Sequence, residues 1–392
     1  MKKNKPITRV GLIGCGRISD IYLKTLSRFE HIEVVSCASL DIGESKAKAQ
    51  KFNIKKAQTP DELIKDESID LVLNLTIPKT HFEVSFKAIH AGKHVYSEKP
   101  LSTSMKDAQI LTDLARNKGV YLGCAPDTFF GNRWQTVRKL IDAGEIGTPT
   151  GIFSFVGTHG TERHHPNPDF YYEDGGGPLM DLGPYYLSLM VFLFGSIVQV
   201  SGLSNRAFQQ RKIENGARNG ENIDVHVDTH VQAMLSFESG LIGSMTMSFD
   251  VWDSETPRFE IYGTEGVICV SDPDPVHGAN IFQGDVWLRK QNNSRWSHQP
   301  RPLGRENWEI PDNLHNLSSD NRGVGLVEMV SAIEHNTTHR ASDSLAIHTL
   351  EAMLGIIKSS NTHKFINLNT KCERPAPLPE NFNDILQHGM KK

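Results

Sequence analysis

The sequence has few cysteines, little net charge and no long apolar run. Its 392 residues include five scattered cysteines and no Cys-x-x-Cys pair. This excludes a zinc ribbon or a redox dithiol, and the odd number is typical of a reducing compartment. A formal net charge of −4 gives no electrostatic basis for binding nucleic acid or an acidic membrane surface. We therefore expect neither partner.

Two segments with some targeting or membrane character fall short of the usual criteria. Met1–Lys5 is basic but runs directly into a strand without an apolar stretch or cleavage site, so no signal peptide is expected. Tyr185–Val200 is the most apolar run, but polar residues and a glycine interrupt it, and a spanning helix needs ~20 residues. A buried helix followed by a strand explains it better. We expect a soluble, cytoplasmic protein.

What the sequence does contain is a glycine turn near its start. The apolar run Val10–Ile13 ends in Gly14-x-Gly16-x-x-Ser19, and an amphipathic run over Ile18–Phe29 follows. Gly14 permits a sharp turn, Gly16 permits close approach to a pyrophosphate, and the small Ser19 lets the helix pack on its strand. An ordinary glycine turn of an α/β protein is the alternative. The residues that we expect at a dinucleotide cofactor from this turn are Gly14, Gly16, Arg17 and Ile18.

The first third of the chain alternates strand and helix patterns, which predicts a doubly wound parallel sheet, here a Rossmann domain over residues 1–126. Ser104 begins one helix, with Asp107 placed as in an acidic capping box. The expected strands are Val10–Ile13, Glu33–Ala38, Asp70–Leu75, His94–Ser97 and Val120–Cys124. The expected helices are Ile18–Phe29, Gly43–Phe52, Pro60–Lys65, His81–Ala91 and Ser104–Asn117.

Strand patterns dominate after Pro126 and predict a second α/β domain over residues 127–375, with a large, open, mostly antiparallel sheet. Glu238–Gly240 and Gly263–Gly266 predict hairpin turns. The expected strands are Gly151–Gly157, Val198–Leu203, His226–Phe237, Leu241–Phe249, Arg258–Tyr262 and Val267–Ser271. The expected helices are Asn132–Ala143, Leu179–Phe194, Gly325–Asn336 and Ser342–Ser360. Three segments without periodicity are interpreted as a mobile loop, an irregular insertion and an extended C-terminal arm: Phe208–Asn222, Asn280–Asp312 and residues 376–392.

The end of the second strand indicates which dinucleotide binds. An acidic residue there usually bonds the ribose hydroxyls, about 20 residues after the glycines. This chain has the neutral Ser39, with Asp41 two residues further and Lys46 and Lys48 on the next helix. Ser39 does not repel a 2′-phosphate, which slightly favours NADP and leaves NAD open. A helix cap at Ser39 is compatible with either cofactor.

Two later strands end in polar residues at the same edge of the sheet, where ligands bind in such folds. Thr76 and Pro78 are expected to border the cofactor, with His81 at the start of the next helix. Glu98 and Lys99, followed by a proline, come after the strand His94–Ser97. The lysine would point into the nicotinamide crevice, since the proline restricts its backbone and stops the strand. A surface lysine with a turn proline is the alternative.

A triple glycine, Gly175–Gly177, leads into a helix on which Asp181 and Tyr185 are four residues apart and share a face. A satisfied buried pair is one explanation, and contact with a hydroxyl-bearing substrate is the other. The preceding loop, His159–Pro168, contains three histidines but lacks the HExxH spacing and a clearly placed acidic ligand, so we expect no metal. We expect a polar loop over the substrate instead. Its candidate binders of hydroxyl or carboxylate groups are Arg163 and His165; structural roles are favoured for Arg322 and His348.

Together, the Gly14 turn, Glu98-Lys99-Pro100 and the segment from the triple glycine through Asp181-x-Gly183-x-Tyr185 resemble the Gfo/Idh/MocA family. The family is named for glucose–fructose oxidoreductase and inositol dehydrogenase, and the resemblance covers nearly the whole chain. It implies a Rossmann domain followed by an α/β domain whose open sheet commonly forms the subunit interface. A homodimer or homotetramer is therefore expected.

The resemblance also implies residue roles. Lys99 would bind the reacting hydroxyl, Asp181 would hydrogen-bond the substrate or Lys99, and Asp127 would lie where the family contacts substrate. Tyr185 stands in place of the family's usual acid/base histidine, as in the branch with dihydrodiol dehydrogenase and xylose dehydrogenase. Because an ammonium favours a nearby phenolate, our hypothesis is that Tyr185 takes the hydroxyl proton while Lys99 stabilises the alkoxide. Lys99 as the only base is the alternative.

The expected function is NAD(P)-dependent hydride transfer to or from a secondary alcohol or ketone of a sugar, polyol or cyclitol derivative. Two alternatives stay open. Some relatives hold NAD tightly and cleave glycosides through a transient keto sugar, which predicts co-purifying cofactor and no net nicotinamide reduction. A non-catalytic dinucleotide sensor predicts that no activity depends on Lys99.

Overall fold

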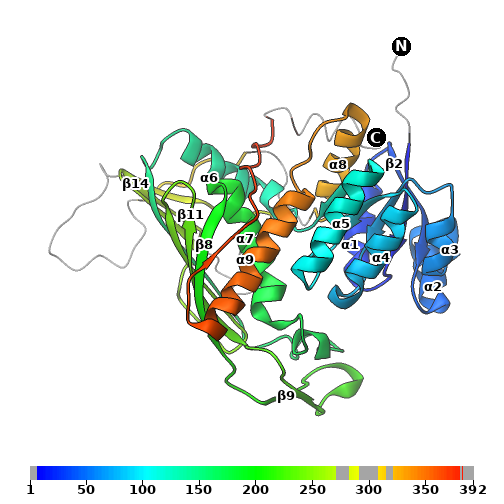
Figure 1. Ribbon diagram of the computed structural model, residues 1–392, viewed down its shortest axis with the longest axis horizontal. Coiled ribbons are helices and arrows are strands. Elements are labelled where there is room, and N and C mark those ends of the chain that lie inside the picture. Colours follow the sequence, from blue (N-terminus) through cyan, green and yellow to red (C-terminus); the bar gives the residue numbers. More distant parts are fainter. Residues whose placement is uncertain (1–6, 271–281, 291–307, 315–320, 380–381, 383–392) are drawn as a thin grey trace. The chain divides into compact units, whose positions relative to one another are not determined.

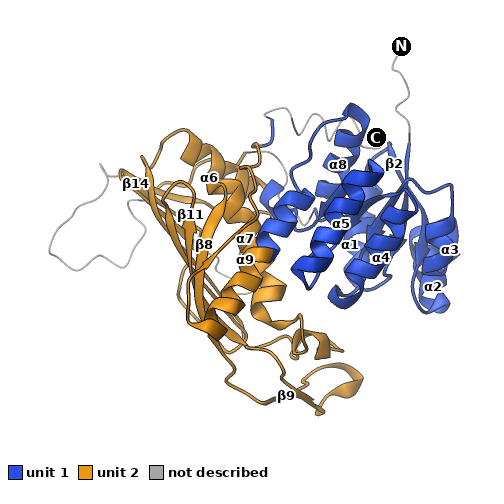
Figure 2. Ribbon diagram, in the orientation of Figure 1, with its two compact units in different colours: residues 1–130, 320–350, 378–392 blue, residues 131–319, 351–377 orange. Residues whose placement is uncertain are grey.

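The computed structural model describes residues 7–270, 282–290, 308–314, 321–379 and 382 (Figure 1). The chain divides into two compact units, which Figure 2 shows in different colours. Unit 1 comprises residues 1–130, 320–350 and 378–392, and unit 2 comprises residues 131–319 and 351–377. The expected domains were contiguous, with boundaries after residues 126 and 375. The chain instead returns to unit 1 at residue 320.

Unit 1 contains a six-stranded parallel sheet in the order β3-β2-β1-β4-β5-β6. This confirms the predicted doubly wound sheet. The strands are β1 (Thr8–Ile13), β2 (Ile32–Ala38), β3 (Lys56–Gln58), β4 (Leu71–Asn74), β5 (His94–Ser97) and β6 (Leu122–Cys124). β3 was not predicted, because three half-exposed polar and small residues carry no strand pattern. The central β4 is wholly buried, as expected for a sheet covered on both faces.

Three helices of unit 1, α2, α3 and α5, begin at a residue whose side chain caps them. Thr59 and Glu62 form a reciprocal capping box, and Ser104 accepts a hydrogen bond from the Asp107 N–H at 3.1 Å. α4 packs beside α5, and α1 contacts α8. These helices are α1 (Ser19–Leu26), α2 (Ile42–Phe52), α3 (Pro60–Lys65), α4 (Pro78–His90), α5 (Met105–Lys118), α8 (Val324–His335) and the first turns of α9 (Asp343–Thr362).

Unit 2 is built on an eight-stranded sheet in the order β15-β14-β13-β7-β12-β11-β8-β16. β7 and β12 are parallel, and the other neighbouring pairs are antiparallel, which confirms the predicted mixed, open sheet. The strands are β7 (Pro149–Gly157), β8 (Ile197–Asn205), β11 (His230–Phe237), β12 (Ile242–Ser248), β13 (Phe259–Gly263), β14 (Gly266–Val270), β15 (Trp287–Lys290) and β16 (Ile366–Asn367).

The apolar run after residue 178 forms the core of unit 2. It lies in α7 (Gly177–Phe194), which packs against β11 and β12, beside α6 (Asn132–Asp142). α7 is long and apolar enough to cross a membrane, but 83% of it is buried, and β8 follows directly. The prediction of a buried helix that runs into a strand is confirmed. The opposite face of the sheet leaves four large apolar side chains exposed: Leu203, Met234, Ile242 and Tyr262.

Two segments expected to be irregular contain strands. Phe208–Asn222 is not a mobile loop, because β9 (Gln210–Lys212) pairs with β10 (Asn222–Asp224). Arg211, the central residue of β9, is also buried. In Asn280–Asp312, β15 adds an edge strand to β14, while residues 280–281 and 291–307 lie outside the described residues. The expected arm lies largely outside them too; its residues 376–379 form neither helix nor strand.

Candidate active site

The glycine turn between β1 and α1 is held between two neighbouring strands. The Gly14 N–H donates to the Ala38 carbonyl at 2.8 Å. Gly14 has a φ of +106°, and a Cβ there would lie 2.4 Å from the Leu75 carbonyl oxygen. Only glycine fits this position, because an L side chain would be strained and would also collide with backbone. The predicted sharp turn is therefore required by the packing.

Gly16 faces open space, and the start of α1 is free of side-chain caps. A Cβ on Gly16 would meet no atom within 4 Å, and Ile18, at the N-cap, makes no side-chain cap hydrogen bond. An uncapped helix start with an unobstructed glycine beside it fits a pyrophosphate, because the N-terminus of a helix favours negative charge. Gly14, Gly16 and the first turn of α1 would hold that part of a dinucleotide.

We expect Gly16→Ala to weaken NADH binding at least about tenfold, because the added methyl would occupy the space that the pyrophosphate needs. The melting temperature should stay close to the wild-type value, since the methyl meets no protein atom. Gly14→Ala, in contrast, should lower the melting temperature strongly. Equilibrium fluorescence and thermal unfolding measure both effects. Unchanged NADH affinity in Gly16→Ala would place the cofactor elsewhere.

Ser39 does not cap α2. Asp41 takes that position, where its carboxylate accepts a hydrogen bond from the Gly43 N–H at 2.7 Å. The Ser39 hydroxyl donates to Glu44 at 2.7 Å instead, while its N–H donates to Ser45. The carboxylate of Glu44 thus lies beside the position that usually contacts the cofactor ribose.

The loop after β4 is tied to α4. Thr76 donates its hydroxyl proton to Asn74 at 2.7 Å, and the amide of the fully buried Asn74 donates to the His81 carbonyl and the Ser85 hydroxyl. α4 begins at Pro78, three residues earlier than predicted, because proline suits a first helical turn. His81 therefore does not open the helix. It lies one turn inside and is fully buried.

Lys99 follows β5 at the carboxyl edge of the sheet, with Glu98 buried beside it. The Tyr22 hydroxyl donates to Glu98 Oε1 at 2.8 Å, and the Lys99 N–H donates to Glu98 Oε2 at 2.9 Å. Burial and the Glu98 charge raise the pKa of Tyr22 well above its usual range, so this phenol stays a donor. The peptide between Lys99 and Pro100 is cis. Glu98 thus fixes the backbone of Lys99 through a buried carboxylate.

Asp127, expected at the substrate, has structural contacts. Its buried carboxylate accepts hydrogen bonds from the Gly323 N–H at 2.8 Å and the Gly325 N–H at 3.0 Å, at the start of α8. A negative charge at a helix N-terminus is favourable, but burial raises the pKa of Asp127 to about 6. The nearby Arg322 charge lowers it. We therefore leave Asp127 out of the substrate site.

Replacing Asp127 by Asn should make the free energy of unfolding less dependent on pH. A carboxyl whose pKa is higher in the folded state binds protons more tightly there, so stability falls as the pH rises from 4.5 through 6. Between pH 4.5 and 7 this costs wild type about 2 kcal/mol. The amide does not titrate and still offers an oxygen to the two glycines. Urea unfolding at both pH values should show the stability difference between the proteins changing by that amount; a constant difference would contradict it.

In unit 2, α7 carries Asp181 and Tyr185 on one face, as predicted. Asp181 is half-buried and Tyr185 is buried, with 8% of its surface exposed. Pro184 lies between them inside the helix and removes one backbone donor there. Gly183 lies against Met353, whose Sδ would be 3.0 Å from a Cβ. The small residue lets α9 approach this turn closely.

The triple glycine brings a preceding turn against the start of α7. A Cβ on Gly176 would lie 2.6 Å from the carbonyl oxygens of Phe170 and Tyr171, so these backbones touch. His165 packs edge-on against both aromatic rings at 5.4 and 5.7 Å. This places one predicted substrate residue close to the N-terminal turn of α7.

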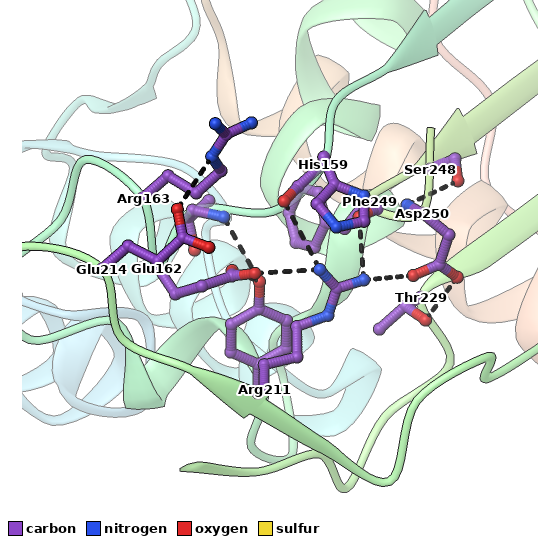
Figure 3. A network of polar contacts seen from close by, with 11 residues as sticks. His159, Glu162, Arg163, Arg211, Glu214, Thr229, Ser248, Phe249 and Asp250 are labelled. Atoms are coloured by element: carbon purple, nitrogen blue, oxygen red, sulfur yellow. Dashed lines mark hydrogen bonds and ion pairs between the residues drawn. The ribbon is translucent and has the colours of Figure 1, made fainter. Parts of the chain in front are cut away.

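A buried arginine holds the loop that precedes this turn (Figure 3). Arg211, on β9, donates to Glu162 at 2.9 Å and to Asp250, which follows β12. Arg211 and Glu162 are buried and Asp250 is partly buried, and the charge of each has a partner of opposite sign. Arg163 lies at the exposed end of the same loop, where it pairs with Glu214. The Arg211 network gives this loop a defined conformation.

The histidines of this loop point to different partners. His159 stacks on Trp252 with ring centroids 3.3 Å apart, whereas His165 packs on the turn before α7. Over the residues that the structure describes, no group of three His, Cys, Asp or Glu side chains could hold a metal ion. His348 is fully buried on α9.

The comparisons with known proteins match both units. Residues 8–125 match the oxidoreductase family with an NAD-binding Rossmann fold, and residues 134–269 match the GFO/IDH/MocA C-terminal domain. The chain belongs to the Gfo/Idh/MocA family. This confirms the resemblance inferred from the sequence. The chain is thus a member of an oxidoreductase family with an NAD-binding Rossmann fold. That Tyr185 replaces the usual histidine remains a prediction.

Individual Gfo/Idh/MocA relatives match over most of the chain. The 1,5-anhydro-D-fructose reductase of Ensifer adhaerens is 28% identical over 375 residues, which are 93% of this chain and 99% of that protein. The dTDP-3,4-didehydro-2,6-dideoxy-alpha-D-glucose 3-reductase of Saccharopolyspora spinosa is 30% identical over 270 residues, 68% and 75% of the two chains. Levoglucosan dehydrogenase with NADH and L-sorbose has the same fold, with a TM-score of 0.77, 19% identity and 93% and 99% coverage.

Proposed function

We propose that the protein is a dehydrogenase or reductase that acts on a secondary alcohol or ketone of a sugar, polyol or cyclitol derivative. One observation carries this proposal: Lys99 follows β5 at the same sheet edge as the uncapped start of α1, and its backbone N–H is bonded to the buried Glu98. An ammonium beside a dinucleotide site suits an oxygen that gains charge as hydride moves. The names of the relatives, which concern sugar derivatives, support this substrate class.

The proposed roles divide the proton and charge chemistry between two residues. A bound nicotinamide supplies the carbon that accepts or returns hydride. In the oxidation direction Tyr185 takes the proton of the substrate hydroxyl, while Lys99 stabilises the resulting alkoxide charge. Asp181 hydrogen-bonds a neighbouring hydroxyl of the substrate. In the reduction direction Tyr185 returns the proton to the carbonyl oxygen.

We further propose NAD as the cofactor. The carboxylate of Glu44, bonded to Ser39, would repel a 2′-phosphate. Lys48, one of the two lysines noted on the next helix, is in an ion pair with Asp20. These contacts outweigh the slight preference for NADP that the neutral Ser39 suggested. Equilibrium binding of NADH and NADPH decides between them.

Two further features of unit 2 concern substrate contacts and assembly. His165 and Arg163 lie on the loop that the Arg211 network supports, so they are the residues that we propose to bind substrate hydroxyl or carboxylate groups. A homodimer or homotetramer would cover the exposed apolar side chains of the open sheet, such as Met234 and Ile242. Light scattering gives the oligomeric state.

The decisive experiment is a panel of sugars, polyols and cyclitols assayed with NAD and NADP, following the absorbance of the reduced nicotinamide. Reduction that depends on a substrate of this class supports the proposal. Co-purified NAD together with glycoside cleavage and no net reduction would favour the glycoside-cleaving alternative. Cofactor binding without turnover of any substrate in either direction would favour a sensor.

A further inference from the structure

The imidazole of His81 lies between two backbone carbonyl groups inside unit 1. Its Nδ1 is 2.6 Å from the Pro100 oxygen and its Nε2 is 2.9 Å from the Thr76 oxygen. Pro100 directly follows Lys99, and Thr76 belongs to the loop after β4. One buried side chain of α4 therefore contacts both segments that flank the expected nicotinamide position.

A neutral His81 ring can donate only one hydrogen bond, and we assign it to the Pro100 carbonyl. Burial lowers the pKa of His81, so the ring is neutral at pH 7 and has a single N–H. Carbonyl oxygens only accept, so just one of the two contacts can be a hydrogen bond in that state. We assign the proton to Nδ1, because its contact is 0.3 Å shorter (2.6 against 2.9 Å).

The position of α4 does not depend on this ring. Asn74 donates to the backbone carbonyl of His81 at 3.1 Å and to the Ser85 hydroxyl at 3.0 Å, which fixes the helix from the end of β4. The ring is thus available to hold the turn after β5. On the other side of that turn, Glu98 accepts from the Lys99 N–H. Lys99 and its following peptide are restrained from both sides.

We propose that His81 is a positioning residue for Lys99, acting through the hydrogen bond from Nδ1 to the Pro100 carbonyl; this rests on the proposed function. Without that bond the Pro100 carbonyl is buried and unpaired, and the turn shifts to satisfy it. Because a displacement of about 1 Å at a reacting group can cost about 10²-fold in rate, a small shift of Lys99 suffices to slow turnover.

Two isosteric substitutions separate the two ring contacts. The amide nitrogen of Asn lies near the Nδ1 position, so His81→Asn should keep the bond to Pro100 and retain turnover within about threefold of wild type. The amide of Gln lies near Nε2, so His81→Gln should lower kcat by about 10- to 100-fold with little change in the dissociation constant for NADH. Ile89→Val, at another buried position of α4, is the matched control and should leave kcat nearly unchanged.

A second measurement works without turnover. After reductive ¹³C-methylation of the full-length protein, the Lys99 signal is identified by its absence in Lys99→Arg. It should move in His81→Gln and stay in place in His81→Asn, even if the substrate panel finds no activity and the proposed function fails. A displaced signal or lost kcat in His81→Asn, or an undisturbed His81→Gln, overturns the positioning role. If His81→Gln fails to fold, the Lys99 signal in His81→Asn decides alone.

Discussion

Replacing Lys99 by Met lowers kcat by about 10²–10³-fold, the loss expected when the charge that stabilises a developing alkoxide is removed. The side chain keeps most of its length and its apolar character, and the backbone N–H still donates to Glu98. The dissociation constant for NADH should therefore stay close to the wild-type value. Steady-state kinetics on the best substrate of the panel, together with NADH fluorescence, measure the two quantities separately.

The control for Lys99→Met is Lys118→Met, which removes an exposed lysine at the end of α5 and should be kinetically silent. Lys99→Arg keeps the charge but changes its geometry, so it should recover only part of the activity. If Lys99→Met kept wild-type turnover, Lys99 would not be a catalytic residue. If NADH binding fell in proportion to kcat, the lysine would bind cofactor rather than stabilise charge.

The fold could be predicted because most strands and helices have a regular pattern of apolar residues. The buried parallel strands, such as β4, are continuous apolar runs, and β11 alternates buried with exposed residues along its length. Glycine turns follow some of these strands, such as β1 and β11. The spacing of apolar residues does not show which of the two sheets a helix will cover. α8 is apolar and buried over most of its length, and its pattern would suit a helix of either unit. Its assignment to unit 1 therefore depends on the tertiary contact of its first turn with Asp127.

The candidate site was predictable only where a residue follows a strand or shares a helix face. Gly14, Lys99 and Tyr185 have such signals, because local spacing fixes their positions. Tyr22 and Asn74 do not have such signals. Tyr22 contacts Glu98, 76 residues away, and Asn74 meets its partners only when α4 packs against β4. Tyr22 looked like an ordinary apolar residue of α1.

Arg211 lies in a segment that looked irregular in the sequence but is ordered in the structure. Its segment is polar and without period, which predicted a mobile loop. In the structure its guanidinium lies buried between Glu162 and Asp250 (Figure 3), so the polarity serves an internal network. The sequence offered as a signal a single arginine in a short polar segment, which is too common on protein surfaces to be informative alone.

Tyr185→Phe is expected to lower kcat by about 10²–10⁴-fold, the range for loss of a positioned acid/base group. The ring keeps its packing in α7, where only 8% of the residue is exposed, so the melting temperature should change little. NADH binding should survive, because the cofactor-binding residues that we propose belong to the other unit. Rapid-mixing kinetics with deuterated substrate would test the role directly: the kinetic isotope effect should rise as the chemical step becomes limiting.

Tyr186 provides the matched control, since it adjoins Tyr185 on the same helix and is fully buried. Tyr186→Phe removes an identical hydroxyl from the neighbouring helix face and should keep turnover near wild type. If both variants lose activity equally, the phenol of Tyr185 has no special role and the effect comes from disturbing α7. If Tyr185→Phe is fully active while Lys99→Met is not, Lys99 is itself the proton acceptor. The tyrosine is then a substrate contact, because Lys99 alone would have to take the proton and stabilise the alkoxide.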